Sequence, residues 1–194
     1  MASQLPTHNY SAGNLRNHFL IAMPGLTDSI FAQTVTFVCD HNAYGAMGIV
    51  LNQPLNIYLE EVFNQLSIDP SESARRKPVL AGGPVNIQQG FVLHRNEGTW
   101  DSSLKITDEV SLTASRDIVA AIGQNKGPAG AQFALGYAGW SAGQLEEELS
   151  ANNWLTVPAD NRIIFDTPIK DRWSAVTNHL GFDLNLISDQ IGHA

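Results

Sequence analysis

The chain has 194 residues, of which 43% are hydrophobic and 15% are charged. This composition excludes intrinsic disorder and a membrane-spanning run, and it suffices for the core of one globular domain. Its 19 acidic and 11 basic residues give a net charge of −8, which does not favour direct nucleic-acid binding, because such binding depends on lysine and arginine.

The N-terminal stretch, residues 1–13, is polar and has no basic region followed by an apolar one, so no secretory signal is visible. We therefore expect a cytoplasmic protein in which residues 1–14 are mobile and residues 15–194 form one domain. The one compact basic stretch, residues 75–77, lies between polar residues and a proline, which is typical of a solvated loop. No direct contact with nucleic acid or with a membrane is expected.

Short apolar runs predict strands in the first part of the chain. Residues 19–23 end at a Pro-Gly turn, and the β-branched residues 34–38 predict a second strand. Residues 47–51 predict a third, which ends before Pro54 and is joined to the second by a connection short enough for a hairpin. A helix follows, because four apolar residues share one of its faces: Leu59, Val62, Phe63 and Leu66.

The same signals predict the remaining elements. Strands are expected at residues 79–81, 90–94, 104–106, 110–112, 132–138 and 163–165, and a loop at residues 69–77. Helices are expected to begin at Ser115, Ser141 and Asp171, whose side chains are good N-caps. Ser141 with Gln144 also fits a capping box.

The order of these elements indicates the fold class. Strands outnumber helices and come in runs of two to four, whereas a doubly wound parallel sheet requires strict alternation. The 16 glycines favour bulges and tight bends in the strands. The sequence therefore predicts an α+β fold with a mixed, largely antiparallel and strongly bent sheet.

Residues 139–143 match the G-x-S-x-G motif of α/β-hydrolases and lie between a predicted strand and a predicted helix. Asp166 and then His179 or His193 even supply the order Ser, Asp, His. However, the chain is short for that fold, its strands do not alternate with helices, and no oxyanion segment precedes the motif. Ser141 has a simpler role as a helix cap, which we prefer.

Cys39 and His41 lie at the end of a predicted strand and share one of its faces, which suggests a thiolate activated by an imidazole. The preferred alternative is that Cys39 is a small apolar residue in a buried strand. A single cysteine also excludes disulfides within the chain and multi-cysteine metal sites. The six histidines show no metal-ligand spacing and no phosphate-binding glycine motif occurs, so we expect no metal and no cofactor.

A binding site is expected at strand ends, where polar backbone groups are free to meet a ligand. Among the polar groups there, His41 has the widest chemical range, because an imidazole titrates near neutral pH. We therefore place the candidate site at His41, with Asp40 and the amides of Gly82 and Gly83 as neighbours. The alternative is that Asp40 and His41 only satisfy the hydrogen bonds of a turn.

Short sequence motifs that are distributed over the chain form a specific combination. They are HFLIAMP from His18, GAMGIVLN from Gly45, GGPV from Gly82, GFVLH from Gly90, ALGYAGW from Ala134, GQLE from Gly143, NWL from Asn153 and GHA from Gly192. Together, from about Leu15 to the C-terminus, they resemble the YqgE/AlgH family of bacterial proteins. The resemblance implies a compact α+β domain with a small, partly closed barrel-like sheet flanked by helices, and it implies no established activity.

Some members of this family carry the label of transcriptional regulator, but the acidic charge and the lack of a helix-turn-helix signature do not support direct DNA binding. Gln53 and Gln89 stand where the family pattern leads us to expect arginine, which removes two charges that an anionic ligand would use. The family also often has glycine at the position of Ser141, which weakens a nucleophilic role.

We therefore expect a binding or regulatory module that acts through a small molecule or a protein partner. The alternative is a small-molecule hydrolase that uses Ser141 or His41.

Overall fold

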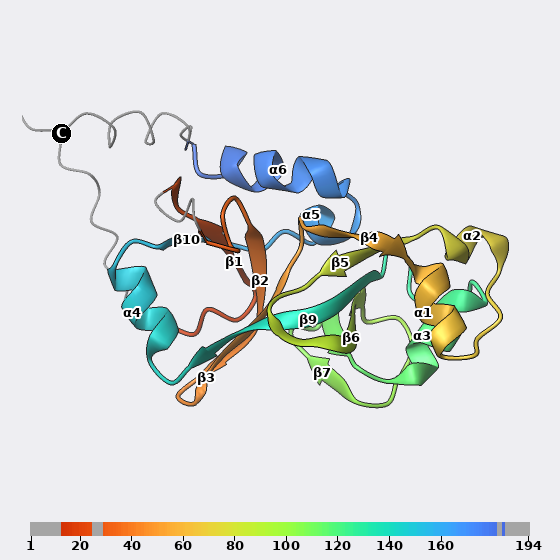
Figure 1. Cartoon of the computed structure of the whole chain (residues 1–194). Helices are drawn as coiled ribbons and strands as arrows, with labels where there is room; N and C mark the ends of the chain where they lie inside the picture. Colours follow the sequence, from red (N-terminus) through yellow and green to blue (C-terminus); the bar gives the residue numbers. More distant parts are fainter. Residues whose placement is uncertain (1–12, 25–28, 182–183, 185–194) are drawn as a thin grey trace, which may run out of the picture.

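A computed structural model describes residues 13–24, 29–181 and 184 of the chain. These residues form one bent sheet of ten strands with helices around it (Figure 1). The strands are β1 (His18–Ala22), β2 (Val35–Asn42), β3 (Gly45–Val50), β4 (Pro54–Tyr58), β5 (Pro78–Ala81), β6 (Val85–Arg95), β7 (Ser103–Lys105), β8 (Val110–Thr113), β9 (Gln132–Ser141) and β10 (Trp154–Pro158). The helices are α1 (Leu59–Gln65), α2 (Glu72–Arg75), α3 (Arg116–Gly123), α4 (Gln144–Ser150), α5 (Asn161–Phe165) and α6 (Arg172–Asn178), with a 3₁₀ turn at Ile169–Asp171. All but the last two residues of the expected mobile segment 1–14 lie outside the described residues.

The central strand of the sheet is β9. The strand order is β10-β1-β2-β3-β9-β6-β8-β7, and β5 joins β9 while carrying β4 on its other side. The C-terminal part of β9 pairs antiparallel with β3, whereas its N-terminal part lies antiparallel to β6 and parallel to β5. The other described pairs are antiparallel, which confirms the predicted mixed, largely antiparallel sheet.

The sheet curls into a half-barrel, with a bend in the middle of β9. Gly136 adopts a φ of 73° at this bend. A Cβ atom on Gly136 would lie only 2.4 Å from the Gly83 carbonyl oxygen, so neither the backbone angle nor the available space admits a side chain. This position therefore lets β9 change partners from β5 and β6 to β3.

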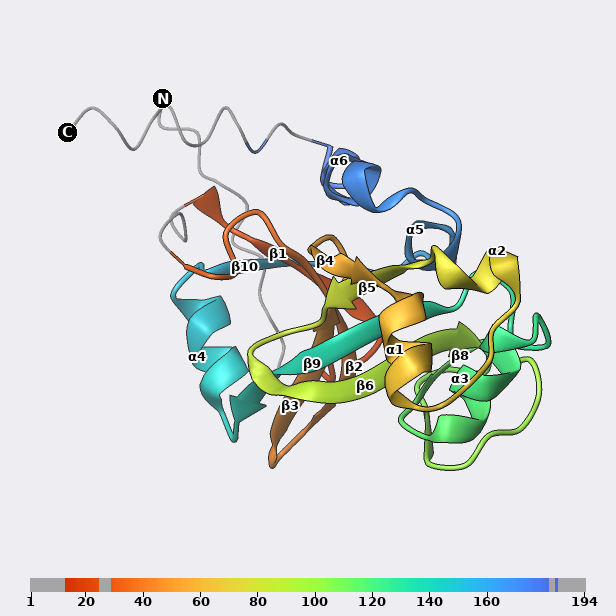
Figure 2. The same ribbon diagram turned by 45° about the vertical axis from the view of Figure 1, so that its right-hand side comes forward.

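The helices cover the sheet in three groups (Figures 1 and 2). α1, α2 and α3 gather at one end, α4 lies at the opposite end beside β3 and β10, and α5 and α6 lie along β1 and β2. Each group covers its own buried apolar cluster, and the helices contribute Phe63 of α1, Leu145 of α4 and Val176 of α6 to these clusters. No helix in the described ranges is long and apolar enough to cross a membrane.

The strand predicted at residues 163–165 is wrong, because these residues belong to the helix α5. The Asp160 side chain accepts a hydrogen bond from the Arg162 N–H at 2.9 Å and so caps this short helix. Its three apolar residues are all buried, and a run of three cannot distinguish a helical period from a strand.

Two strands and one short helix have no counterpart among the elements predicted from the sequence. β4 begins at Pro54, a residue that in the sequence only marks the end of the preceding strand, because proline is tolerated at the first residue of an edge strand. β10 is an edge strand that pairs with β1. The predicted loop at residues 69–77 contains α2.

Candidate functional site

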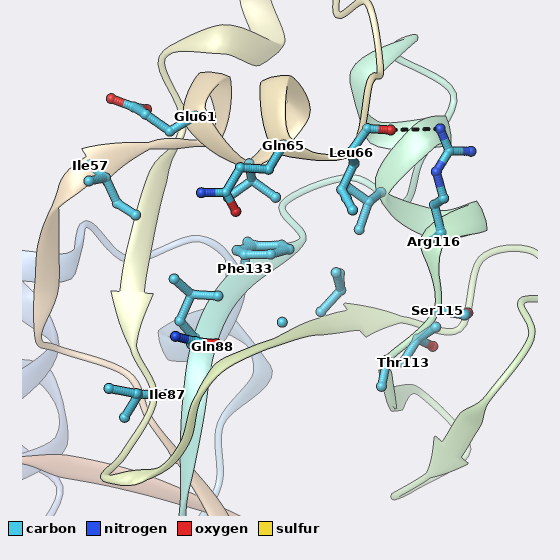
Figure 3. A pocket seen from close by; sticks show the side chains of 16 residues that line it. Ile57, Glu61, Gln65, Leu66, Ile87, Gln88, Thr113, Ser115, Arg116 and Phe133 are labelled. Carbon is cyan, nitrogen blue, oxygen red and sulfur yellow. Dashed lines mark hydrogen bonds between the residues drawn. The ribbon is translucent and has the colours of Figure 1, made fainter.

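A cleft of about 630 Å³ lies on the sheet face that carries α1 and α3 (Figure 3). α1 and the start of α3 form its walls, β6 and β9 form its floor, and β4 lies at one end. This volume is within the range of small-molecule sites. The lining residues are Ile57, Glu61, Val62, Gln65, Leu66, Ile87, Gln88, Gly90, Val92, Thr113, Ala114, Ser115, Arg116, Val119, Phe133 and Leu135.

The floor of the cleft is apolar, and the Phe133 ring lies at its centre (Figure 3). Gly90 lets this ring lie close to β6, because a Cβ atom there would lie 2.7 Å from Phe133 Cζ and the ring would have to shift. Val92 and Leu135 continue the apolar surface on either strand. Phe133 is 4% and Val92 1% exposed, so these side chains form the buried base of the cleft.

One edge of the cleft is an unpaired segment of β6. This strand pairs with β9 at Val85 and again from Gly90, with a register shift between them, and with β8 from Val92 onward. Residues 86–89 therefore have no ladder partner within the described part of the chain. Ile87 in this segment is 65% exposed, although it is a large apolar residue that lines the cleft.

The other end of the cleft is held together by Arg116. Its Nη2 atom donates a hydrogen bond to the Leu66 carbonyl oxygen at 2.9 Å, which links the start of α3 to the end of α1. Figure 3 shows Arg116 and Glu61 at opposite ends of the cleft, and these are its two charged lining residues. Glu61 Oε2 accepts the Tyr58 N–H at 2.9 Å, whereas Arg116 forms no ion pair with a carboxylate of the described residues.

A buried polar network supports this end of the cleft from below. The Thr113 hydroxyl oxygen lies 2.7 Å from both Ser103 Oγ and His94 Nε2. His94 Nδ1 lies 2.7 Å from the Arg95 carbonyl oxygen, so Nδ1 carries the proton and Nε2 accepts one from Thr113. Burial lowers the pKa of His94, so the imidazole is neutral at neutral pH.

A second hollow, of about 730 Å³, has a polar lining that includes Asp108, Glu109, Asp160 and His179. Asp160 is already paired with Arg162, whose Nη2 atom lies 2.8 Å from its Oδ2. In the described ranges no three ligating side chains come close enough together to hold a metal ion. This hollow therefore lacks both an apolar floor and a ligand set.

The predicted site residues His41 and Asp40 lie at the end of β2, and neither lines these two hollows. His41 is 8% exposed, and both of its ring nitrogens are engaged. Nδ1 accepts the Leu15 N–H at 3.0 Å, so Nε2 carries the proton that it donates to Glu146 Oε1 at 2.7 Å. The hydrogen bonds from its own backbone N–H and from His41 lower the pKa of Glu146.

The structure does not bring Gly82 and Gly83 to His41. The Val50 N–H donates to the Gly82 carbonyl oxygen at 2.9 Å, while Ala46 is the residue opposite His41 on the same strand. The four steps along the strand from Ala46 to Val50 span about 13 Å. The Gly82 N–H also donates to a carbonyl oxygen of β9 at 2.9 Å, so this amide is already used in a hydrogen bond within the sheet.

Ser141 is not the N-cap of α4, and that prediction is wrong. It is the last residue of β9, and Gly143 occupies the N-cap position with a φ of 76°. The Ser141 N–H and Oγ–H both donate to Gln144 Oε1, at 3.0 and 3.2 Å. The pairing of Ser141 with Gln144 is therefore confirmed, but it closes a turn before the helix.

Cys39 lies on β2 and is fully buried in the hydrophobic core, and this burial raises the pKa of its thiol far above the usual range. Its Sγ–H group points to the Phe37 carbonyl oxygen at 3.6 Å. The prediction that Cys39 acts as a small apolar residue agrees with this position, because an inert thiol is no nucleophile.

Sequence reasoning missed the cleft, because its lining comes from segments that are far apart in the chain. One signal was available in the predicted apolar stripe of α1. Leu59 and Phe63 of this stripe are buried, whereas Val62 and Leu66 remain partly exposed and line the cleft. A helix whose apolar stripe is wider than its buried face indicates a surface that something else can cover.

The fold defines an α+β half-barrel protein with a cleft beside its helices. The AlgH-like family model (DUF179) matches residues 19–185, so the chain belongs to this family, which confirms the resemblance. A UPF0301 protein from Saccharophagus degradans is 59% identical over 181 residues, covering 93% of this chain and 89% of the relative. A UPF0301 protein from Nitrosococcus oceani is 51% identical over 180 residues, covering 92% and 96%.

Solved structures show the same fold. The solution structure of the AlgH protein from Pseudomonas aeruginosa is 45% identical and superposes with a TM-score of 0.78, covering all of both chains. A crystal structure of a protein from Corynebacterium diphtheriae is 19% identical, with a TM-score of 0.71 over 96% of this chain and 93% of that one. These are bacterial proteins of uncharacterised function, and their names state no activity.

Proposed function

We propose that this protein is a binding module that holds a mainly apolar ligand in the cleft between α1, α3 and β6. The observation that carries the proposal is a hollow of about 630 Å³ with an apolar, aromatic floor and a few polar side chains at its rim. This combination is typical of ligand sites, because the floor supplies affinity and the rim supplies orientation.

Partly exposed apolar side chains favour occupancy of the cleft. Val62, Leu66 and Ile57 are incompletely covered, and Ile87 is 65% exposed. Covering such surface stabilises a complex by about 25 cal/mol for each Å² removed from water. A ligand that spans these residues would complete the packing that the chain itself leaves open.

The alternative, hydrolysis at Ser141, has less support. Ser141 Oγ is bonded to an amide oxygen of Gln144, and no histidine in the described ranges forms a hydrogen bond with it. An imidazole base within reach is what activates a serine for attack. The net charge of −8 remains our reason to expect that this binding module makes no direct contact with DNA.

The test uses 2-naphthamide, a neutral apolar probe, titrated into the full-length protein and followed by ¹H–¹⁵N NMR. We expect saturable binding, with the largest shifts at Gly90, Phe133 and their neighbours on α1. Ile87→Glu should weaken binding about tenfold, since it removes apolar contact and adds a charge at the rim. Ile30→Glu is the matched control, because Ile30 is 71% exposed and does not line the cleft.

Equal affinity of the wild-type protein and the two variants would overturn the proposal. So would shifts that map to another face of the molecule, or the absence of saturable binding.

A further inference from the structure

The charges around the cleft are few, and they are placed asymmetrically. Arg116 stands at one end and Glu61 at the other, with the Phe133 ring between them (Figure 3). One oxygen of Glu61 is engaged with the Tyr58 N–H, and the Arg116 guanidinium makes one hydrogen bond, to the Leu66 carbonyl oxygen. Among the described residues no carboxylate neutralises Arg116, although the protein as a whole is acidic.

We infer that the ligand of this cleft is an apolar carboxylic acid, whose carboxylate pairs with Arg116 and whose apolar body lies across Phe133. The inference rests on the proposed function and names its ligand class. A guanidinium has five N–H donors, so one bond to Leu66 leaves a face that matches the two oxygens of a carboxylate. The apolar floor beside it accounts for the rest of the molecule.

Glu61 determines the orientation of this ligand. A carboxylate at the Glu61 end would meet a like charge, whereas at the Arg116 end it meets the opposite one. The five helical steps from Glu61 to Leu66, the C-cap of α1, span about 7.5 Å, so an apolar body of at least this length keeps the acid away from Glu61. The end of that body reaches Ile57 and Ile87, which provide apolar surface where the cleft opens.

The experiment compares 2-naphthoate with its neutral isostere 2-naphthamide. In the wild-type protein we expect the acid to bind about fivefold more tightly, which is the upper range for a partly exposed ion pair. Arg116→Gln should remove this preference, so that the acid and the amide bind this variant with equal affinity, and Arg116→Lys should retain part of the preference. Arg76→Gln is the control for net charge, because Arg76 is exposed and lies outside the cleft.

The results separate the two proposals. Binding of the amide without any preference for the acid would overturn the carboxylate inference and leave the apolar cleft standing. A preference that survives in Arg116→Gln, or that is lost equally in Arg76→Gln, would overturn it as well. Failure of both probes to bind would instead overturn the proposed function.

A further arm identifies the source of the carboxylate. N-acetyl-Ala-Ala-Phe is titrated as the free acid and as the C-terminal amide. A preference for the peptide acid that exceeds the preference for 2-naphthoate, and that depends on Arg116, supports the inference with a polypeptide C-terminus as ligand. A preference confined to 2-naphthoate supports it with a free small acid.

Discussion

Replacement of Arg172 by methionine should destabilise the protein by about 3 kcal/mol. This arginine begins α6, is 2% exposed, and donates three hydrogen bonds to parts of the chain that are distant from one another. Nη1 bonds the Leu51 carbonyl oxygen at 2.7 Å, Nη2 bonds Gln132 Oε1 at 2.7 Å, and Nε bonds the Thr167 carbonyl oxygen at 3.1 Å.

Two opposing effects determine this magnitude. Each hydrogen bond from a charged donor contributes about 1.5–3 kcal/mol, and methionine leaves all three acceptors without this partner. Burial lowers the pKa of Arg172 to about 10, and desolvation of this size opposes folding by about 3 kcal/mol. Methionine removes the desolvation cost but also loses the three hydrogen bonds, so the net change is a substantial destabilisation.

Urea denaturation followed by circular dichroism measures this change, provided that the transition is two-state. Arg76→Met is the control, because Arg76 is exposed, and it should change the free energy of unfolding by less than about 0.5 kcal/mol. Arg172→Lys separates charge from geometry, since an ammonium lacks the planar fork that serves acceptors on different sides. If the free energy of unfolding of Arg172→Met lies within about 1 kcal/mol of the wild-type value, the three hydrogen bonds do not outweigh the desolvation of the guanidinium, and the argument is refuted.

Three further predictions concern α4 and nucleic acid. The Glu148 carboxylate accepts hydrogen bonds from the indole N–H groups of Trp140 at 2.9 Å and Trp154 at 2.7 Å. Glu148→Ala should therefore destabilise the protein by about 2–3 kcal/mol and alter its tryptophan fluorescence. An unchanged free energy of unfolding would contradict this prediction. The pKa of Glu146 lies below its usual value of 4.5, so its contribution to stability is present above that pH and is lost as the pH falls through the lowered value. Glu146→Gln should therefore flatten the acid limb of a stability-against-pH curve, and an unchanged limb would show that the bond with His41 contributes nothing. Because its net charge is −8, the wild-type protein should not bind duplex DNA at physiological salt. Fluorescence anisotropy measures this binding, and a sub-micromolar affinity with a steep salt dependence would contradict the prediction.

The sequence by itself determined the fold class and the middle of most elements. Strand runs such as residues 34–38 and 132–138 are long enough to show their pattern, and the apolar stripe of α1 has a helical period. Local signals also identified the N-cap positions Ser115 and Asp171, although neither side chain donates or accepts a capping hydrogen bond. The family followed from phrases distributed over the whole length.

Only the tertiary structure decided the short elements. α5, β4 and β10 have five residues each, which is too few for a period to be distinguished. β4 and β10 are strands because β5 and β1 offer them hydrogen bonds, and α5 is a helix that buries Ile163, Ile164 and Phe165 together. Their conformation is set by contacts across the fold, which overrule weak local preference.

The cleft and the buried arginine were likewise invisible in the sequence. Residues 57, 90, 116 and 133 carry no shared spacing, and they meet because β9 pairs with β5 and β6 while α1 and α3 pack over the same face. Arg172 has the sequence context of an ordinary exposed helix residue, yet its acceptors are brought to it from Leu51 and Gln132. Burial and proximity depend on which distant segments come together, and no local pattern encodes this.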